Sequence, residues 1–579
     1  SSRPGPPPRG GRALPSPPPP CARGGAMSKC VVVASGYFNP LHYGHVSFLQ
    51  KARDAGTSLI VIVNNDAQTA RKMSEHPGFV AYGQPARDRV RLVRSLACVD
   101  AAIEAVDEDE SVAGTLRMLH PDVFANGGKQ RATDKEASVC AELGIKMVIG
   151  LGVEMLILQP FTQHYDWGKP RSKSAVAALT GADAFNSPQV PSAKPYAELW
   201  MGDHPSGPSQ VHSPSGGTPG CLIHTLQTSP YMLGEKLQEV KQLPFLMKVL
   251  SIHKALSIQA HPDRSLAAKL HAERPDVYKD ANHKPEIAIA LTDFEALCGF
   301  RPIPELVRLA DAVPELSDAI GSPAMDGLRA AGGRAERGAA ALKAAYCAVM
   351  RLPPARMDEL LKGLVSRVRM PSPMDATDEV VLQTFRLIER LHDQFGNDIG
   401  LFSVFFLNIV RMGVGECLYM PQNTPHAYLS GDIVECMACS DNVVRGGLTP
   451  KFKDLDVLCE MLEYRGDVPP CIEPEQVEAG VLLYAHKELE EFQVTHVHMA
   501  AGSTRRHCFS GQGPALGFAF KGSGAVRISG ESTPLKAGTV FLLAAGVDCD
   551  ISAAEELDCF VACCPPQYFT RSKSRREAW

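Results

Sequence analysis

Residues 31–45 read VVVASGYFNPLHYGH and set the fold of the first part of the chain. A short apolar, β-branched run predicts a buried strand, a turn rich in Gly, Asn and Pro ends it, and a helical pattern follows at once. This order predicts that His42 and His45 lie at the carboxyl end of the strand, beside a helix N-terminus, where α/β sheets bind anions. The intervening Gly44 lets the backbone approach a phosphate group closely.

Apolar strand-like runs alternate with helical stretches from Lys29 to about Gly152. The runs are CVVVAS, SLIVIVNN, AAIEAV, PDVFANG and IKMVIGLG. A doubly wound parallel sheet has this order, because each strand is followed by a helix that crosses back over the sheet. The sequence therefore predicts one α/β domain over residues 27–153. Residues 1–26 are rich in Pro and Gly and have no periodic apolar pattern, so we expect a disordered leader there.

The pattern changes after Glu154, where short apolar strands separated by turn residues predict antiparallel β structure. We expect a first β-barrel domain over residues 154–303 and 396–470. A helical insertion is expected at residues 304–395, where the apolar period becomes helical. Strands return later, so residues 471–579 are expected to form a second small barrel. The predicted fold class is an α/β domain followed by all-β barrels with a helical insertion.

The composition excludes several classes of protein. Of the 579 residues 45% are hydrophobic, which is enough for several globular cores, and the net charge of -5 gives no overall basic field for nucleic acid or an anionic membrane. The longest apolar run, residues 147–158, is interrupted by Glu154 and is too short to cross a membrane. Seventeen cysteines without regular spacing indicate free thiols in a reducing compartment, and we expect a cytoplasmic protein.

The H-x-G-H motif at His42 and His45 resembles the nucleotidyltransferases of the cytidylyltransferase type, over the whole α/β domain. The resemblance implies that both histidines stabilise the transition state of nucleotidyl transfer and that Gly36, Phe38 and Asp66 help to bind the nucleotide. The cofactor would be Mg²⁺ with CTP or ATP. The stretch IGLGVEMLILQPF after the last strand departs from the family, because it has no Ser, Thr, Arg or Lys to hold the β- and γ-phosphates. We therefore expect a poor catalyst.

Four residues of the first β domain have side chains that can bind a metal: Gln259, His261, Glu286 and His426. Gln259 and His261 stand two apart, so on a strand their side chains point to one face. Two imidazoles, a carboxylate and an amide oxygen suit zinc and leave room for water or substrate. Spacing alone leaves a purely structural role open.

Several segments around these residues together resemble type I mannose-6-phosphate isomerase, over about residues 155–579. They are QHYDWGK, PYAELWMG, SIQAHPD, HKPEIAIAL and PHAYLSGDIVECMACSDNVVRGGLTPKFKD, in the order of the family. The resemblance implies one zinc ion held by the four residues in a cupin barrel, with a second cupin-like domain at the C-terminus. It also implies interconversion of mannose 6-phosphate and fructose 6-phosphate through a cis-enediol, which supplies mannose 6-phosphate for GDP-mannose and glycan synthesis.

The same resemblance implies roles for further residues. Arg445 would lie by the metal and offset the charge of the enediolate, because a guanidinium does not lose its proton. Lys248, Ser257 and Lys451 match the phosphate contacts of the family. Two groups are candidates for the base that moves the proton of the sugar: Lys284 and a metal-bound water. The other candidate substrate-binding residues are Asp166, Glu198, Tyr428 and Glu435.

Three functions are therefore weighed. The first is a zinc-dependent isomerase of sugar phosphates that carries a nucleotidyltransferase-like domain. The second is a bifunctional enzyme that also transfers a nucleotidyl group from CTP or ATP to a phosphorylated compound. The third is a non-catalytic sugar-binding cupin with a nucleotide-sensing domain, which is disfavoured because all four ligand positions and Arg445 are present. No nucleic acid or membrane partner is expected, and the oligomeric state is left open.

Overall fold

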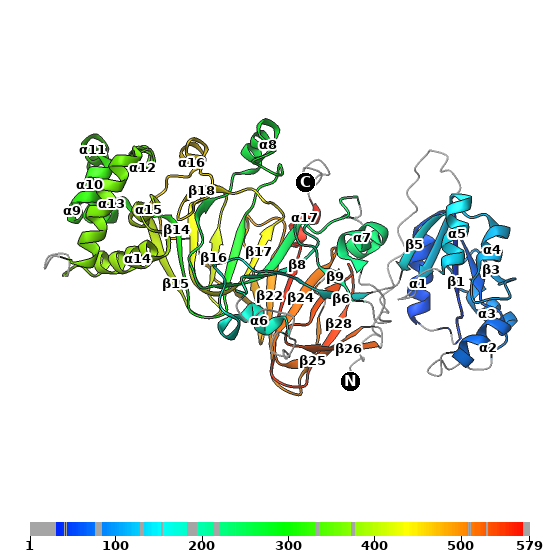
Figure 1. Cartoon of the computed structure of the whole chain (residues 1–579). Helices are drawn as coiled ribbons and strands as arrows, with labels where there is room; N and C mark the ends of the chain where they lie inside the picture. The colour runs from blue at the N-terminus through cyan, green and yellow to red at the C-terminus, as the bar shows by residue number, and fades with distance from the viewer. Residues whose placement is uncertain are drawn as a thin grey trace, which may run out of the picture. The chain divides into compact units, whose positions relative to one another are not determined.

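The computed structural model describes residues 30–570, except residues 40, 42, 76–83, 128–132, 152–153, 182–193, 213–219, 235, 238, 332–334, 372–376, 470, 508, 510 and 529–530. The described residues form two compact units, the first made mainly of residues up to 147 and the second mainly of residues from 148 onward (Figure 1). The predicted leader at residues 1–26 and the predicted catalytic residue His42 lie outside the described residues. No described helix is long and apolar enough to cross a membrane.

A five-stranded sheet with the order β3-β2-β1-β4-β5 forms the first unit. The pairs β1–β2, β1–β4 and β2–β3 are parallel, and residues 32–34 of β1 are buried because this strand lies in the middle of the sheet. Its strands are β1 (Val31–Gly36), β2 (Ser58–Val63), β3 (Ala101–Glu104), β4 (Val123–Gly127) and β5 (Lys146–Leu151). Its helices are α1 (Tyr43–Asp54), α2 (Asp66–Glu75), α3 (Ala86–Arg94), α4 (Ala113–Leu119) and α5 (Asp134–Leu143). The predicted parallel α/β arrangement is confirmed.

An eleven-stranded sheet lies in the second unit, with β13, β17 and β11 adjacent in its middle. Every residue of β11 is buried, because both faces of this strand are covered, and even a lysine in it is removed from solvent. The strands are β7 (Phe161–Gln163), β8 (Glu198–Met201), β11 (Phe245–Ile252), β12 (Ile258–Ala260), β13 (Glu286–Ala290), β14 (Phe294–Phe300), β15 (Leu407–Met412), β16 (Cys417–Met420), β17 (His426–Ala438), β18 (Val444–Gly447) and β19 (Cys471–Ile472).

Helices between β14 and β15 gather at one end of the second unit (Figure 1). They are α9 (Ile303–Ala312), α10 (Pro314–Ile320), α11 (Ser322–Ala331), α12 (Ala335–Met350), α13 (Pro354–Arg369), α14 (Glu379–Phe395) and α15 (Gly400–Phe406). The longest, α14, starts where the Asp378 side chain accepts hydrogen bonds from the backbone of Val380 and Val381, and it ends at Gly396, whose φ is 68°. It buries an apolar stripe that includes Val381, Phe385 and Ile388.

The remaining strands of the second unit form a nine-stranded and a four-stranded sheet. The first contains β6 (Met155–Gln159), β9 (Gln210–Val211), β10 (Gly220–Cys221), β20 (Glu475–Glu478), β21 (Val481–Tyr484), β22 (Gln493–Met499), β24 (Ala515–Lys521), β27 (Val540–Leu543) and β29 (Leu557–Cys563). The second contains β23 (Thr504–His507), β25 (Ser523–Ile528), β26 (Glu531–Lys536) and β28 (Cys549–Ala553). Strand β6 pairs with β27, so the larger sheet crosses the expected boundary between the two barrels.

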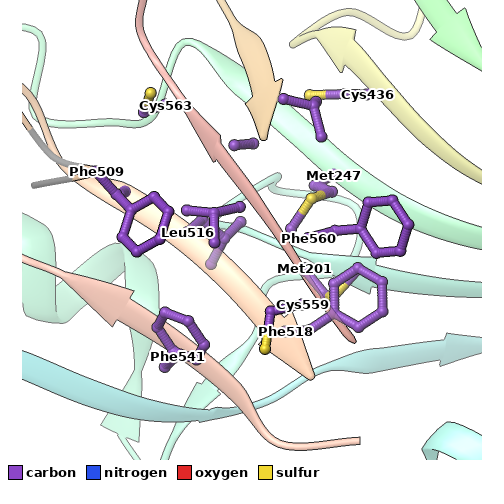
Figure 2. Packing of buried hydrophobic residues seen from close by; sticks show 14 of the residues in the cluster. Met201, Met247, Cys436, Phe509, Leu516, Phe518, Phe541, Cys559, Phe560 and Cys563 are labelled. Carbon is purple, nitrogen blue, oxygen red and sulfur yellow. The ribbon is translucent and has the colours of Figure 1, made fainter. Parts of the chain in front are cut away.

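One hydrophobic core joins the two barrels. Met201, Met247 and Cys436 of the eleven-stranded sheet belong to the same buried cluster as Phe518 and Phe560 of the C-terminal sheet, as Figure 2 shows. The two barrels therefore bury apolar surface against each other. The remaining helices are α6 (Ala175–Leu179), α7 (Leu222–Thr228), α8 (Arg264–Glu273), α16 (Leu455–Met461) and α17 (Pro566–Thr570), with 3-10 turns at Arg171–Lys173 and Pro230–Leu233.

Candidate functional site

Three predicted ligands meet inside the eleven-stranded sheet. His261 follows β12, Glu286 begins β13 and His426 begins β17, and all three are at most 2% exposed. The Oε2 atom of Glu286 lies 3.4 Å from His261 Nε2 and 3.4 Å from His426 Nε2. Tetrahedral zinc with bonds of about 2.05 Å separates neighbouring ligand atoms by roughly 3.3 Å, so the spacing fits an ion of this kind.

The facing atoms of these residues are buried and have no hydrogen-bond partner: His261 Nε2, His426 Nε2 and Glu286 Oε2. The other ring nitrogens face backbone carbonyls, since His261 Nδ1 lies 2.7 Å from Asn442 O and His426 Nδ1 lies 3.0 Å from Thr424 O. A carbonyl only accepts, so each Nδ1 carries the proton and each Nε2 presents its lone pair to the centre. Burial lowers the pKa of His261 to about 4, which keeps this imidazole neutral. The residues present therefore fit a metal ion.

Gln259 reaches the same face of the sheet. It lies on β12 directly opposite His426 on β17 and opposite Arg445 on β18. Residues directly opposite on antiparallel strands point to the same side. The structure thus brings the fourth predicted ligand beside the buried trio, although a bulge follows Ile258 in this strand.

The carboxylate of Glu286 lies between a lysine and two imidazoles. Its Oε1 lies 3.2 Å from the Nζ of Lys284, while its Oε2 faces the imidazoles. Burial acts to raise the pKa of Glu286, but the Lys284 ammonium and His261 lower it well below its ordinary value. Lys284 therefore lies beside the buried trio of His261, Glu286 and His426.

A second polar cluster fills the neighbouring part of the barrel. Lys248 Nζ lies 3.0 Å from Glu435 Oε2 and 3.6 Å from Glu198 Oε2, and Tyr428 donates to Glu435 Oε1 at 2.9 Å. Burial acts to lower the pKa of Lys248, but Glu435 and Glu198 raise it above its ordinary value. Trp200 donates to Glu198 Oε2 at 2.5 Å and its ring lies 5.0 Å from Lys248 Nζ. The structure thus brings together Lys248, Glu198, Tyr428 and Glu435, which were all predicted, with Trp200, which was not. Trp200 stands two residues after Glu198, so on a strand the two side chains share one face, and this spacing could have indicated that they meet.

The remaining predicted substrate residues are more open. Ser257 is half-buried just before β12, and Lys451 is exposed in the loop after β18. Asp166 is exposed in the turn after β7, and no contact within the described part of the chain ties it to the buried cluster.

Arg445 is half-buried beside the metal centre. Among the described residues no carboxylate lies within ion-pair distance of its guanidinium, and burial alone lowers its pKa. A half-buried cation without a fixed partner is suited to an anion that arrives with a ligand.

Glu491, which the sequence did not single out, connects the C-terminal domain to both metal-bearing segments. This carboxylate is 1% exposed and its Oε1 lies 2.8 Å from Arg264 Nη2 and 2.9 Å from His283 Nε2. Arg264 starts α8 just after His261, and His283 precedes Lys284 and Glu286. Only folding brings this residue near, because it lies more than 200 positions downstream of both partners.

In the first unit, the predicted nucleotide-binding residues surround the turn after β1. A Cβ at Gly36 would lie 2.8 Å from the ring of Phe38, and that ring is fully buried, so Phe38 packs under the turn. His45 is partly exposed on α1. Asp66 accepts from Arg89 Nη2 at 2.8 Å at the start of α2.

Arg89 is a residue of this region that the sequence analysis missed. It is fully buried, and its Nη1 donates to Tyr37 O at 2.7 Å and to Asn64 O at 2.8 Å. Its place on the buried stripe of α3, with Ala86 and Val93 at helical spacing, is the signal that could have found it.

Comparison with known proteins gives three family matches. Residues 155–303 match the catalytic domain of type I phosphomannose isomerase, residues 320–407 match the helical insertion domain of the same family, and residues 33–151 match the cytidylyltransferase-like family. The predicted fusion of two kinds of protein is thereby confirmed.

The matches to individual relatives span most of the length of each relative. Mannose-6-phosphate isomerase 2 of Arabidopsis thaliana is 38% identical over 414 residues, which are 70% of this chain and 92% of the relative. The mannose-6-phosphate isomerase of Rattus norvegicus is 46% identical over 310 residues, which are 52% of this chain and 71% of the relative. A crystal structure of mannose 6-phosphate isomerase bound with zinc and yttrium has a TM-score of 0.59 at 27% identity and covers 70% of this chain and 99% of its own. A variant of phosphomannose isomerase from Salmonella typhimurium has a TM-score of 0.60 at 26% identity, with 70% of this chain and 99% of its own covered.

Proposed function

The chain belongs to the type I phosphomannose isomerase family, and we propose that it interconverts mannose 6-phosphate and fructose 6-phosphate through a cis-enediol. The observation that carries the proposal is the convergence of His261, Glu286 and His426 on one buried point, with three facing atoms that lack any hydrogen bond. Supply of mannose 6-phosphate for GDP-mannose and glycan synthesis is part of the same proposal.

Gln259, His261, Glu286 and His426 would hold one zinc ion. When bound, zinc orients the open-chain sugar and polarises its oxygen atoms. The zinc-bound relative and the orphaned ligand atoms of this chain support the assignment.

Arg445 and Lys284 are proposed to act on the charge that develops on the sugar. The half-buried guanidinium of Arg445 offsets the negative charge of the enediolate, since it cannot lose its proton. Lys284, 3.2 Å from Glu286, is placed to hydrogen-bond an enediolate oxygen at the edge of the centre.

The phosphate contacts are proposed at Ser257 and Lys451. Lys451 is exposed, and within the described ranges no carboxylate pairs with it, so its charge is available to a dianion. Lys248 is instead paired with Glu435 and Glu198 inside the barrel. We therefore assign it to the polar cluster that positions the open-chain sugar, and not to the phosphate contacts.

The test uses the full chain and a coupled assay for fructose 6-phosphate. A chelator should abolish turnover and zinc should restore it. His426→Ala should lose both zinc and activity, whereas His253→Ala, a change at an exposed histidine between β11 and β12, should keep both. Full turnover in the zinc-free protein would overturn the proposal.

For the first unit we propose a nucleotide-binding fold without efficient transfer. The chain leaves β5 at Leu151 and enters β6 at Met155, and the stretch between supplies no side chain for a triphosphate tail. Pyrophosphate release from CTP or ATP with Mg²⁺ should equal that of a His42→Ala/His45→Ala variant. Release that depends on these histidines would instead favour the bifunctional enzyme.

The cysteines in the described part of the chain are all free thiols, including many that are buried in the cores. Free thiols support a reducing compartment, and we propose the cytoplasm.

A further inference from the structure

The corner between α14 and α15 lies directly against the segment that follows β18. Asp398 stands in this corner, and its side chain is 13% exposed. A Cβ atom at Gly447, the last residue of β18, would lie 2.6 Å from the Cα of Gly400, so the two backbones are in contact. The end of the helical insertion therefore packs against the chain just after Arg445.

The carboxylate of Asp398 binds both sides of this contact. Its Oδ1 accepts from Leu448 N at 2.6 Å and from Gly400 N at 2.7 Å. Its Oδ2 accepts a longer hydrogen bond from Thr449 N at 3.4 Å and lies 4.0 Å from Lys453 Nζ. The negative charge of Asp398 thus faces N–H groups and an ammonium, which offset it.

The backbone that Asp398 holds has an unusual shape. Leu448 has a φ of 54°, in the left-handed region that residues with a Cβ atom rarely adopt. Its side chain is 1% exposed and belongs to the large apolar cluster that contains the helical insertion. A conformation of this kind persists only where the surroundings impose it. The hydrogen bond to Asp398 and the burial of Leu448 therefore set the direction in which the chain leaves β18.

Thr449 connects this fixed point to Lys451. The Thr449 side chain is buried, and its Oγ1 accepts from Lys451 N at 3.1 Å. The carbonyl of Thr449 also accepts from Lys453 Nζ at 3.1 Å. The backbone of Lys451 is thus anchored through Thr449 to Asp398, whereas Lys451 itself is exposed.

We propose that Asp398 is a positioning residue for phosphate recognition, which holds the segment after β18 so that Lys451 meets the phosphate group of the sugar. The helical insertion, which ends at this corner, thereby contributes to the selection of phosphorylated sugars over free ones. The inference rests on the proposed function, because Lys451 is a phosphate contact only if the chain acts on a sugar phosphate. Arg445 is held separately, by the pairing of β18 with β12. Loss of Asp398 should therefore act on substrate binding more than on proton transfer.

The first experiment measures steady-state kinetics and zinc content of the full chain. Asp398→Ala should raise KM for mannose 6-phosphate by about tenfold while kcat stays within about twofold and zinc content is unchanged. Asp398→Asn keeps an oxygen that can accept from Leu448 N and Gly400 N, so its KM should stay close to that of the wild type. Asp393→Ala, at an exposed acid on α14, is the matched control and should behave like the wild type.

The second experiment tests the path through Lys451. Thr449→Val keeps the shape of the side chain but removes the acceptor for Lys451 N, so it should also raise KM without loss of zinc. If Asp398 acts through Lys451, the double variant Asp398→Ala/Lys451→Ala should have the same KM as Lys451→Ala alone. Full additivity of the two changes would overturn the proposal, and so would a wild-type KM in Asp398→Ala. If Asp398→Ala does not fold, Thr449→Val decides by the same criterion.

A readout without turnover separates this proposal from the proposed function. Inorganic phosphate should raise the unfolding temperature of the wild type, and Asp398→Ala should need about tenfold more phosphate for the same increase. A wild type that shows this dependence on Asp398 but does not isomerise mannose 6-phosphate would contradict the proposed function alone. A wild type that isomerises the sugar, with an Asp398→Ala variant that responds equally to phosphate, would contradict the role of Asp398 alone.

Discussion

Two backbone carbonyls set the tautomers of the metal centre. Asn442 and Thr424 each face the Nδ1 of a histidine, which leaves both Nε2 atoms directed at Glu286. Asn442 is itself fixed by Asp280 and Asn282, since its Nδ2 donates to Asp280 O at 2.7 Å and to Asn282 O at 3.0 Å. The orientation of the imidazoles is therefore built into the backbone before any ion binds.

At Arg445 we predict a loss of rate without a loss of metal. Arg445→Met should lower kcat by roughly 100-fold or more, the usual effect of removing a group that stabilises an oxyanion. Zinc content should stay at one equivalent in the catalytic centre, because the guanidinium is not a ligand. Arg445→Lys should recover part of the rate. Steady-state kinetics together with metal analysis test this, and a variant that loses zinc in proportion to activity would contradict it.

Asp203 should make stability depend on pH. Burial raises the pKa of Asp203 to about 7, although Leu243 N donates to its Oδ2 at 3.0 Å. An acid whose pKa is higher in the folded state stabilises the protein below its unfolded pKa, and this contribution is lost as the pH rises toward 7. Asp203→Asn removes that loss, and its amide oxygen can still accept from Leu243.

The variant should therefore gain stability relative to the wild type between pH 5 and pH 8, by about 2–3 kcal/mol at about 1.4 kcal/mol per pKa unit. Urea unfolding at both pH values measures the change. An equal difference at pH 5 and pH 8 would show that Asp203 ionises normally in the folded protein.

At the scale of elements, the metal centre depends on how loops are tied to strands. The ligand Glu286 begins β13, but His261 lies past the end of β12, where the chain turns into α8. Glu491 from the C-terminal domain binds Arg264 of α8 and His283 of the loop before β13. The buried carboxylate of Glu491 thus ties the start of α8 to the loop before β13. This contact fixes the distance between the segments that carry His261 and Glu286.

Glu491→Ala should destabilise the protein by about 1–3 kcal/mol, because it removes the buried carboxylate that Arg264 and His283 both contact. It should also weaken zinc retention, since the two loops lose their common contact. Glu491→Gln keeps a hydrogen-bond acceptor and should retain more zinc. Glu488→Gln, an exposed change three residues earlier, serves as the control. Competition with a chelator measures retention, and equal retention by Glu491→Ala and the wild type would refute the link.

At the scale of the whole molecule, each unit has buried apolar residues of its own. The apolar clusters described in the second unit include residues from Leu158 to Phe569. The first unit is organised around buried strands and the buried Arg89. Each unit has its own source of stability, and we expect a thermal transition for each.

Arg89→Met should lower only the transition of the first unit. It leaves the carbonyls of Tyr37 and Asn64 without this donor, at a cost of about 2–4 kcal/mol. A chelator should lower the other transition, which contains the metal centre. Differential scanning calorimetry distinguishes the two, and a shift of both transitions by Arg89→Met would show that the units unfold together.

The sequence by itself determined the alternation of strands and helices in the first unit and the helical insertion, and it predicted the candidate metal ligands, because local periodicity and motifs carry this information. Only the tertiary structure decided that β6 joins the C-terminal sheet, that Lys248 is paired inside the barrel, and that Glu491 reaches the metal-bearing loops. The physical reason is that strand pairing and buried ion pairs join residues far apart along the chain. No local pattern of sequence specifies which distant partner will satisfy a buried charge.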